Sequence, residues 1–187
     1  MEGEFDARNF NTFAASRRST RDFLPTPVPE GLIEEIIAAG LTSPSWSNTR
    51  PFVVAVAEGE VRDRLSAEFL SRFEFVKTGQ GEGLFGKIKA LIRRKGMPTS
   101  NWLVLKKYHK DLLPRSQRVG KELFTQMGID RDDKDARDGF WARNYEFFGA
   151  PVELFLFTHK SLGKFAASDA GLFMQNLMLS AHSKGLG

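Results

Sequence analysis

Three arginines and a serine lie close together near the start of the chain. The segment reads RRSTRDF from residue 17 to residue 23, so Arg17, Arg18, Ser19 and Arg21 fall within five residues. A guanidinium offers forked N–H donors that fit two oxygens of a phosphate, and a serine hydroxyl adds a further hydrogen bond. The segment therefore predicts an oxyanion site, and a solvated basic turn is the alternative.

A second polar segment, SPSWSNTRPF, occupies residues 43–52 and leads into a short apolar run. Its candidate binding residues are Pro44, Ser45, Ser47 and Asn48. Small hydroxyls, an amide and free backbone donors suit the polar edge of a planar heterocycle. An ordinary loop rich in serine and proline is the alternative, because such composition is typical of loops.

The composition is that of a globular protein. The chain has 187 residues, of which 41% are hydrophobic and 27% are charged, and this balance argues against disorder. The absence of cysteine excludes disulfides, thiolate metal sites and cysteine nucleophiles. No apolar run approaches the ~18 residues that a membrane-spanning helix needs, and the N-terminus lacks the pattern of a secretory signal. We expect a soluble, cytoplasmic protein.

Positive charge is concentrated in the middle of the chain. Residues 77–121 contain twelve Lys or Arg and two acidic residues, a net charge of +10, whereas the whole chain carries +4. Such a segment favours an anionic partner, either a nucleotide or a nucleic acid. A solvated basic face is the alternative.

Other motifs are weaker. Residues 81–86, GEGLFG, fit the G-x-G-x-x-G pattern, but no strand is predicted before them and no acidic residue follows at the required distance, so we interpret them as a flexible loop. The three histidines are too far apart for a zinc site. The aspartates at 130–135 lack the glycine and glutamate of a calcium loop and fit a helix start. We predict no metal site.

Hydrophobic periodicity predicts a mixture of helices and two strands. The expected strands are 52–57, which is continuously apolar, and 152–158, and both are expected to be buried. The expected helices are 6–16 with Asp6 as N-cap, 29–40 from Pro29 to Gly40, 60–76, 117–127, 133–144, and a last helix capped by Ser168 or Asp169 that ends near Lys184.

The order of these motifs resembles the FMN-dependent nitroreductase family. The pattern R-R-S-x-R ends the first helix, P-V-P precedes the second, and P-S-x-S-N-x-x-P precedes a strand. Ala150-Pro151 before the second strand and D-x-G-x-x-x-Q-N-L from Asp169, followed by G-L-G at the end, complete the match. Trp46 and Arg50 depart from the pattern, and the bulk of Trp46 either narrows the site or anchors the loop.

The resemblance implies an α+β fold, with a central, mostly antiparallel sheet flanked by helices, in a homodimer that binds FMN at the subunit interface. Arg17, Arg18, Ser19 and Arg21 would bind the FMN phosphate and ribityl chain. Pro44, Ser45, Ser47 and Asn48 of the partner subunit would line the isoalloxazine. We expect one domain over 1–187, with a basic variable insertion at about 77–143 and the family's C-terminal part absent.

The resemblance also implies the reaction. Hydride would pass from NADH or NADPH to flavin N5 and then to a nitroaromatic, quinone or similar acceptor, so no catalytic side chain is assigned. Tyr108 and Trp102 could stack on the acceptor or be buried within the insertion. A flavin-consuming or reductive dehalogenase-type relative on the same fold is one alternative function, and a basic nucleic-acid-binding module is another, although no nucleic-acid motif is present.

Overall fold

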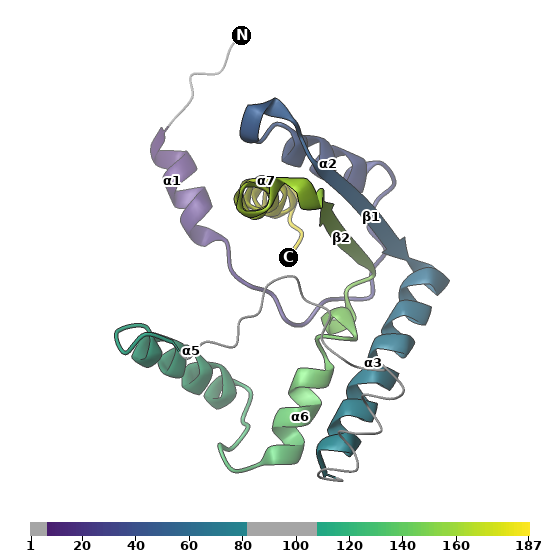
Figure 1. Ribbon diagram of the computed structural model, residues 1–187, viewed down its shortest axis with the longest axis vertical. Coiled ribbons are helices and arrows are strands. Elements are labelled where there is room, and N and C mark those ends of the chain that lie inside the picture. The colour runs from purple at the N-terminus through teal and green to yellow at the C-terminus, as the bar shows by residue number, and fades with distance from the viewer. Residues whose placement is uncertain (1–6, 82–107) are drawn as a thin grey trace. The chain divides into compact units, whose positions relative to one another are not determined.

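The computed structural model describes residues 7–81 and 108–187 (Figure 1). The chain divides into two compact units. The first unit comprises Met1–Asp63 and Phe148–Gly187, and the second comprises Arg64–Phe147. The assignment of one domain with an insertion at 77–143 stays a prediction. No helix within the described ranges is long and apolar enough to cross a membrane.

Two antiparallel strands form the sheet of the first unit. Strand β1 (Phe52–Glu58) pairs with β2 (Val152–Thr158), so that Phe52 lies opposite Thr158 and Glu58 lies opposite Val152 (Figure 1). Each strand is a short apolar run that follows a proline, and both predicted strands are confirmed. Strand β1 ends at Gly59, whose φ of 51° turns the chain away from the strand direction.

The expectation that both strands are buried is wrong, because β2 is mostly half-buried and β1 is mostly half-buried or exposed. Val53 and Val56 of β1 are 65% and 43% exposed, whereas Ala57 is buried. In β2, Phe157 is 56% exposed. The sheet of the described residues has two strands, and helix α7 packs against β2, so some of the apolar side chains have no covering layer in a single chain.

Helix α7 (Lys164–Ser183) is the central element of the first unit. It packs against helix α2 (Leu32–Leu41), and Phe173 of α7 and Ile36 of α2 are the most deeply buried large side chains. A Cβ atom added to Gly40 would lie 2.9 Å from the Phe173 ring. Gly40 therefore lets the two helices approach closely instead of ending α2.

Three predicted helix starts are corrected or lie outside the described residues. Helix α7 begins at Lys164 after Gly163, so Ser168 and Asp169 are inside the helix and cap nothing. Helix α2 begins at Leu32 because Gly31, with a φ of 77°, is the residue before it; Pro29 is not the first helical residue. Helix α1 is Ala7–Ser16, and its predicted N-cap Asp6 lies outside the described residues.

The second unit is built from helices and aromatic contacts. Helix α3 (Gly59–Gly81) enters it from the first unit, and helices α5 (Leu113–Gln126) and α6 (Lys134–Ala142) follow. Phe140 is buried and meets Phe124 edge to face, with ring centroids 5.7 Å apart. The side chain of Asp133 accepts a hydrogen bond from the Ala136 N–H at 2.9 Å, which confirms that this acidic run starts a helix.

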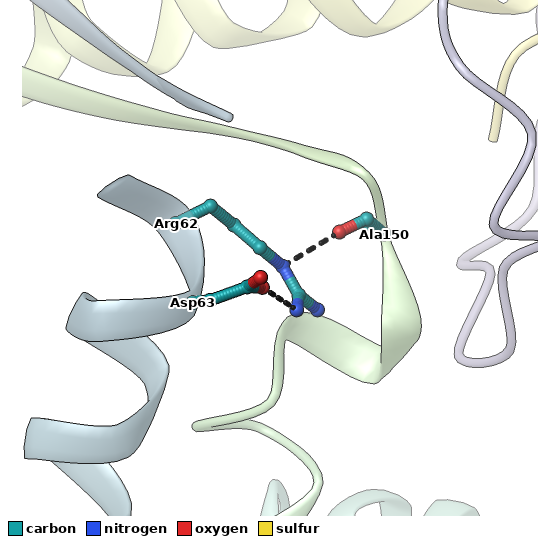
Figure 2. Close-up of polar contacts among 3 residues, drawn as sticks. All are labelled: Arg62, Asp63 and Ala150. Carbon is teal, nitrogen blue, oxygen red and sulfur yellow. Dashed lines mark hydrogen bonds and ion pairs between the residues drawn. The ribbon is translucent and has the colours of Figure 1, made fainter. Parts of the chain in front are cut away.

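Arg62 links two parts of the first unit that each lie, along the chain, close to a boundary with the second unit. Its Nε donates to the Ala150 carbonyl at 3.0 Å, and its Nη1 contacts Asp63 Oδ1 at 2.9 Å (Figure 2). The turn before Ala150 contains Phe148 and Gly149, with φ of 52° and 82°. The arginine thus fixes the chain between this turn and the start of β2.

Candidate functional site

The basic segment, residues 17–21, follows α1 directly. Helix α1 ends at Ser16, and the chain then leaves the helical conformation. Arg18, Ser19 and Arg21 are exposed, whereas Arg17 is half-buried and its Nη1 donates to the Arg18 carbonyl at 3.1 Å.

The guanidiniums of the basic segment are not neutralised within the described part of the chain. No carboxylate of residues 7–81 or 108–187 forms an ion pair with Arg17, Arg18 or Arg21. Exposed like charges crowded into five residues repel one another, and an anion relieves that repulsion. The segment can therefore bind an oxyanion such as phosphate.

The ends of the basic segment are fixed to the C-terminal part of the first unit. Ser16 Oγ lies 2.8 Å from His182 Nε2 of α7, and the His182 ring stacks on Phe13. Beyond the segment, the Phe23 N–H donates to the Phe148 carbonyl at 3.1 Å. A Cβ added to Gly187 would lie 2.7 Å from Thr20 Oγ1, so the last residue of the chain packs against the segment.

The serine–asparagine loop, residues 43–51, has an unusual backbone. Ser47, Asn48 and Arg50 have φ of 51°, 53° and 44°, in the left-handed region that non-glycine residues rarely adopt. A 3-10 turn at Trp46–Asn48 lies within the loop, and the Ser45 Oγ accepts the Arg50 N–H at 2.9 Å. Ser47 and Asn48 are exposed, so their polar groups are available to a ligand.

Helix α7 holds this loop. Ser43, which is buried, donates through Oγ to the Leu172 carbonyl at 3.2 Å. The carboxylate of Asp169 accepts the Trp46 N–H at 3.0 Å. The Trp46 ring stacks on Phe165 with centroids 4.0 Å apart, so the bulk of Trp46 anchors the loop.

The loop contacts α7 closer to the start of the helix than Ser16 does, the residue directly before the basic segment. The loop contacts the helix at Asp169 and Leu172, and Ser16 contacts it at His182. Residues 169 and 182 of an α-helix are separated by about 20 Å along the axis, at ~1.5 Å per residue. Among the described residues, no hydrogen bond or ion pair joins the basic segment to the loop.

The two predicted acceptor-stacking residues, Tyr108 and Trp102, stay a prediction. Tyr108 is 57% exposed in the second unit. Trp102 and most of the +10 segment lie outside the described residues, as does the glycine motif beyond Gly81.

Asp169 is the residue that the sequence did not assign to the site. It was interpreted as a possible helix cap, yet its side chain is 5% exposed and contacts the loop. The D-x-G-x-x-x-Q-N-L motif contained the signal, since Asp169 and Asn176 both lie in it, and Asn176 Nδ2 is 3.4 Å from Thr42 Oγ1 at the start of the loop.

Comparison with known proteins agrees with this architecture. Residues 14–187 match the Nitroreductase family. The chain is 34% identical over 178 residues to a 4-nitrobenzoate reductase of Pseudomonas putida, covering 95% of this chain and 70% of that protein. It is 29% identical to the nitroreductase NfnB of Mycolicibacterium smegmatis, covering 91% of this chain and 64% of that protein.

Solved structures give the same result. The FMN-dependent nitroreductase NfnB from Mycobacterium smegmatis, solved in complex with NADPH, superposes with a TM-score of 0.75 at 27% identity. That comparison covers 96% of this chain and 72% of the other. The fold is that of the nitroreductases, and the chain belongs to the nitroreductase family.

Proposed function

We propose that this chain is an FMN-dependent oxidoreductase that takes hydride from NAD(P)H and reduces nitroaromatic, quinone or similar acceptors. The observation that carries the proposal is the set of three guanidiniums in residues 17–21 that no carboxylate of the described chain neutralises. The names of the relatives support the acceptor class, since the chain is 34% identical to a 4-nitrobenzoate reductase.

The basic segment fits the phosphate end of FMN. Arg17, Arg18 and Arg21 offer charged donors, Ser19 offers a hydroxyl, and three of these four residues are exposed. Arginine binds phosphate through paired N–H donors, and such charge-assisted hydrogen bonds are about twice as strong as neutral ones. These residues would hold and orient the phosphate and the ribityl chain.

The serine–asparagine loop fits the ring end. Three left-handed residues in the loop bend the backbone sharply and leave the side chains of Ser47 and Asn48 exposed. Backbone strain of this kind persists only where surrounding contacts enforce it, and it clusters at ligand sites. Pro44, Ser45, Ser47 and Asn48 would form the polar edge that orients a flavin ring.

FMN and the residues of the chain would contribute differently to catalysis. Bound FMN supplies the hydride relay between NAD(P)H and the acceptor. The chain's own residues bind the phosphate, orient the ring and limit access to it. No residue is assigned as a catalytic acid or base.

Two copies of the chain would complete each site. The loop and Ser16, the residue directly before the basic segment, contact α7 at residues about 20 Å apart along the helix axis, which supports a site that takes the basic segment from one copy and the loop from the other. Val53 and Phe157, which lie opposite each other in the sheet, are exposed in a single chain, as expected for a surface that a second copy covers. We propose a cytoplasmic homodimer with shared flavin sites.

Purified protein tests the proposed function. We expect the chain to take up added FMN, shown by flavin absorbance that stays with the protein after gel filtration. In the absence of oxygen, it should then oxidise NADPH beyond the amount of bound FMN when a nitroaromatic such as 4-nitrobenzoate is added. A parallel assay with a haloaromatic, followed by product identification, separates the reductive dehalogenase alternative. A protein that retains no FMN at saturating concentration contradicts the proposal.

A further inference from the structure

Asp169 is a buried carboxylate on the loop-facing part of α7. Its side chain is 5% exposed, and its Oδ2 accepts the Trp46 N–H at 3.0 Å. The residue lies inside the helix Lys164–Ser183, so its carboxylate is not used to cap its own helix. Its hydrogen-bond partner is a backbone N–H that is distant in the sequence.

Burying the Asp169 carboxylate costs free energy unless its contact with the Trp46 N–H compensates for it. A buried charge loses its hydration, and within the described residues no Lys, Arg or His forms an ion pair with Asp169. A carboxylate that accepts a backbone N–H makes a charge-assisted hydrogen bond, as at a helix N-cap. Trp46 is the first residue of the 3-10 turn. Its N–H has no partner within that turn, because the first N–H groups of a helix have no preceding carbonyl in it.

The loop depends on an external contact at this point. Its internal hydrogen bonds run from Asn48 N–H to the Ser45 carbonyl, from Thr49 N–H to the Trp46 carbonyl and from Arg50 N–H to Ser45 Oγ. These bonds close the turn on itself but do not attach it to the rest of the unit. The contact with Asp169 attaches the turn at its first residue, next to the left-handed Ser47 and Asn48.

We infer that Asp169 is a positioning residue, which holds the serine–asparagine loop in the conformation that binds the flavin ring. The expected effect on flavin binding rests on the proposed function. The contact between Asp169 and the Trp46 N–H does not. Asp169 does not touch the exposed faces of Ser47 and Asn48, so it acts through the Trp46 N–H.

The donor can be removed without changing the helix. Ser45 has φ −141° and ψ 157°, the extended conformation that a residue before proline prefers. Proline is tolerated at the first position of a helical turn. Trp46→Pro therefore suits the backbone, and it breaks the contact in two ways, because it removes the N–H and places its Cδ against the Asp169 carboxylate. Trp46→Ala, which removes the ring but keeps the N–H, is its matched control.

The test combines these variants with Asp169→Ala and Asp169→Asn in a double-mutant cycle. We expect Trp46→Pro to bind FMN at least about tenfold more weakly than Trp46→Ala, as for the loss of a hydrogen bond to a charged group. Asp169→Ala should cause a similar loss in the Trp46→Ala background and almost none in the Trp46→Pro background. Asp169→Asn, which keeps an acceptor oxygen, should restore most of the affinity. Glu34→Ala, which removes an exposed carboxylate on α2, should change nothing.

Amide hydrogen exchange of the flavin-free protein supplies a second readout. Faster exchange at Asn48 and Thr49 in Asp169→Ala, but not in Glu34→Ala, supports the inference. Equal FMN affinity of Trp46→Pro and Trp46→Ala, or an equal effect of Asp169→Ala in both backgrounds, overturns it. If the parent protein binds no FMN, the proposed function fails, and unchanged loop exchange in Asp169→Ala then overturns the positioning role separately.

Discussion

At the scale of single residues, the proposed phosphate site depends on charges that no carboxylate of residues 7–81 or 108–187 neutralises. Arg17, Arg18 and Arg21 form no ion pair with a carboxylate of the described chain, and two of the three are exposed. Surface arginines usually contribute little to stability. Their crowding is better explained by a bound anion than by the fold.

Arg17→Ala and Arg21→Ala should each weaken FMN binding. Loss of one charged hydrogen bond to phosphate costs about 1.5–3 kcal/mol, or roughly ten- to a hundredfold in affinity. Fluorescence titration of FMN measures the loss, and Arg64→Ala, an exposed arginine on α3, is the control. If both variants bind FMN as tightly as the parent, the phosphate binds elsewhere.

Glu153 makes stability depend on pH. Burial raises the pKa of this half-buried carboxyl on β2, and Arg62 opposes the rise without cancelling it. Because the folded-state pKa is above the unfolded value, the folded state favours the protonated group. The stabilisation is complete below the unfolded pKa and is lost as the pH rises through the folded pKa.

Glu153→Gln should therefore stabilise the protein at pH 7, and the gain should vanish below about pH 4, near the ordinary pKa of glutamate. The gain should stay below about 1 kcal/mol, because the group is partly solvated. Urea unfolding of both proteins at the two pH values measures it. A variant that is less stable than the parent at pH 7 would show that the attraction to Arg62 outweighs the burial of Glu153.

The sequence was more informative about which segments could bind a ligand than about the backbone conformation of those segments. RRSTR and the serine–asparagine loop could be recognised as binding segments because guanidiniums, hydroxyls and amides have known chemistry. The left-handed conformations of Ser47, Asn48 and Arg50 could not, because contacts with α7 help to fix them. For the same reason Asp169 was missed, since only the fold brings it to Trp46.

At the scale of elements, the packing of α2 on α7 fixes the first unit. Gly40 is buried, and its missing side chain admits the Phe173 ring. Both strands could be predicted, since short β-branched runs after proline have few alternatives. The start of α7 could not be predicted. Ser168 and Asp169 are typical cap residues, so the helix was expected to begin there and not at the run KFAA, which begins at Lys164.

Gly40→Ala should destabilise the protein by about 1–3 kcal/mol, because overpacking a tight contact outweighs the helix propensity gained from alanine. Gly139→Ala on α6 is the control, since an added Cβ there meets nothing within 4 Å; it should be neutral or slightly stabilising. Thermal unfolding distinguishes the two. Equal melting temperatures for the two variants would mean that α2 and α7 separate at little cost.

At the scale of the whole molecule, the proposed flavin site draws on two copies of the chain. The chain spans 70% of the length of the Pseudomonas putida relative and 64% of that of the Mycolicibacterium smegmatis relative. In the described residues its sheet has two strands. The loop contacts α7 at Asp169, and Ser16, directly before the basic segment, contacts it at His182. The proposed dimer would bring the basic segment and the loop together from different copies.

Mixing two defective variants tests this central claim most directly. Arg21→Ala removes a phosphate contact and Asn48→Ala removes a ring contact, so each variant alone should bind FMN weakly. In a mixed dimer, one site carries both substitutions and the other carries neither. Co-refolding equal amounts should therefore return about one quarter of all sites to parental FMN affinity. If the mixture binds FMN no better than the average of the two variants refolded separately, each site is built from a single chain and the account is contradicted.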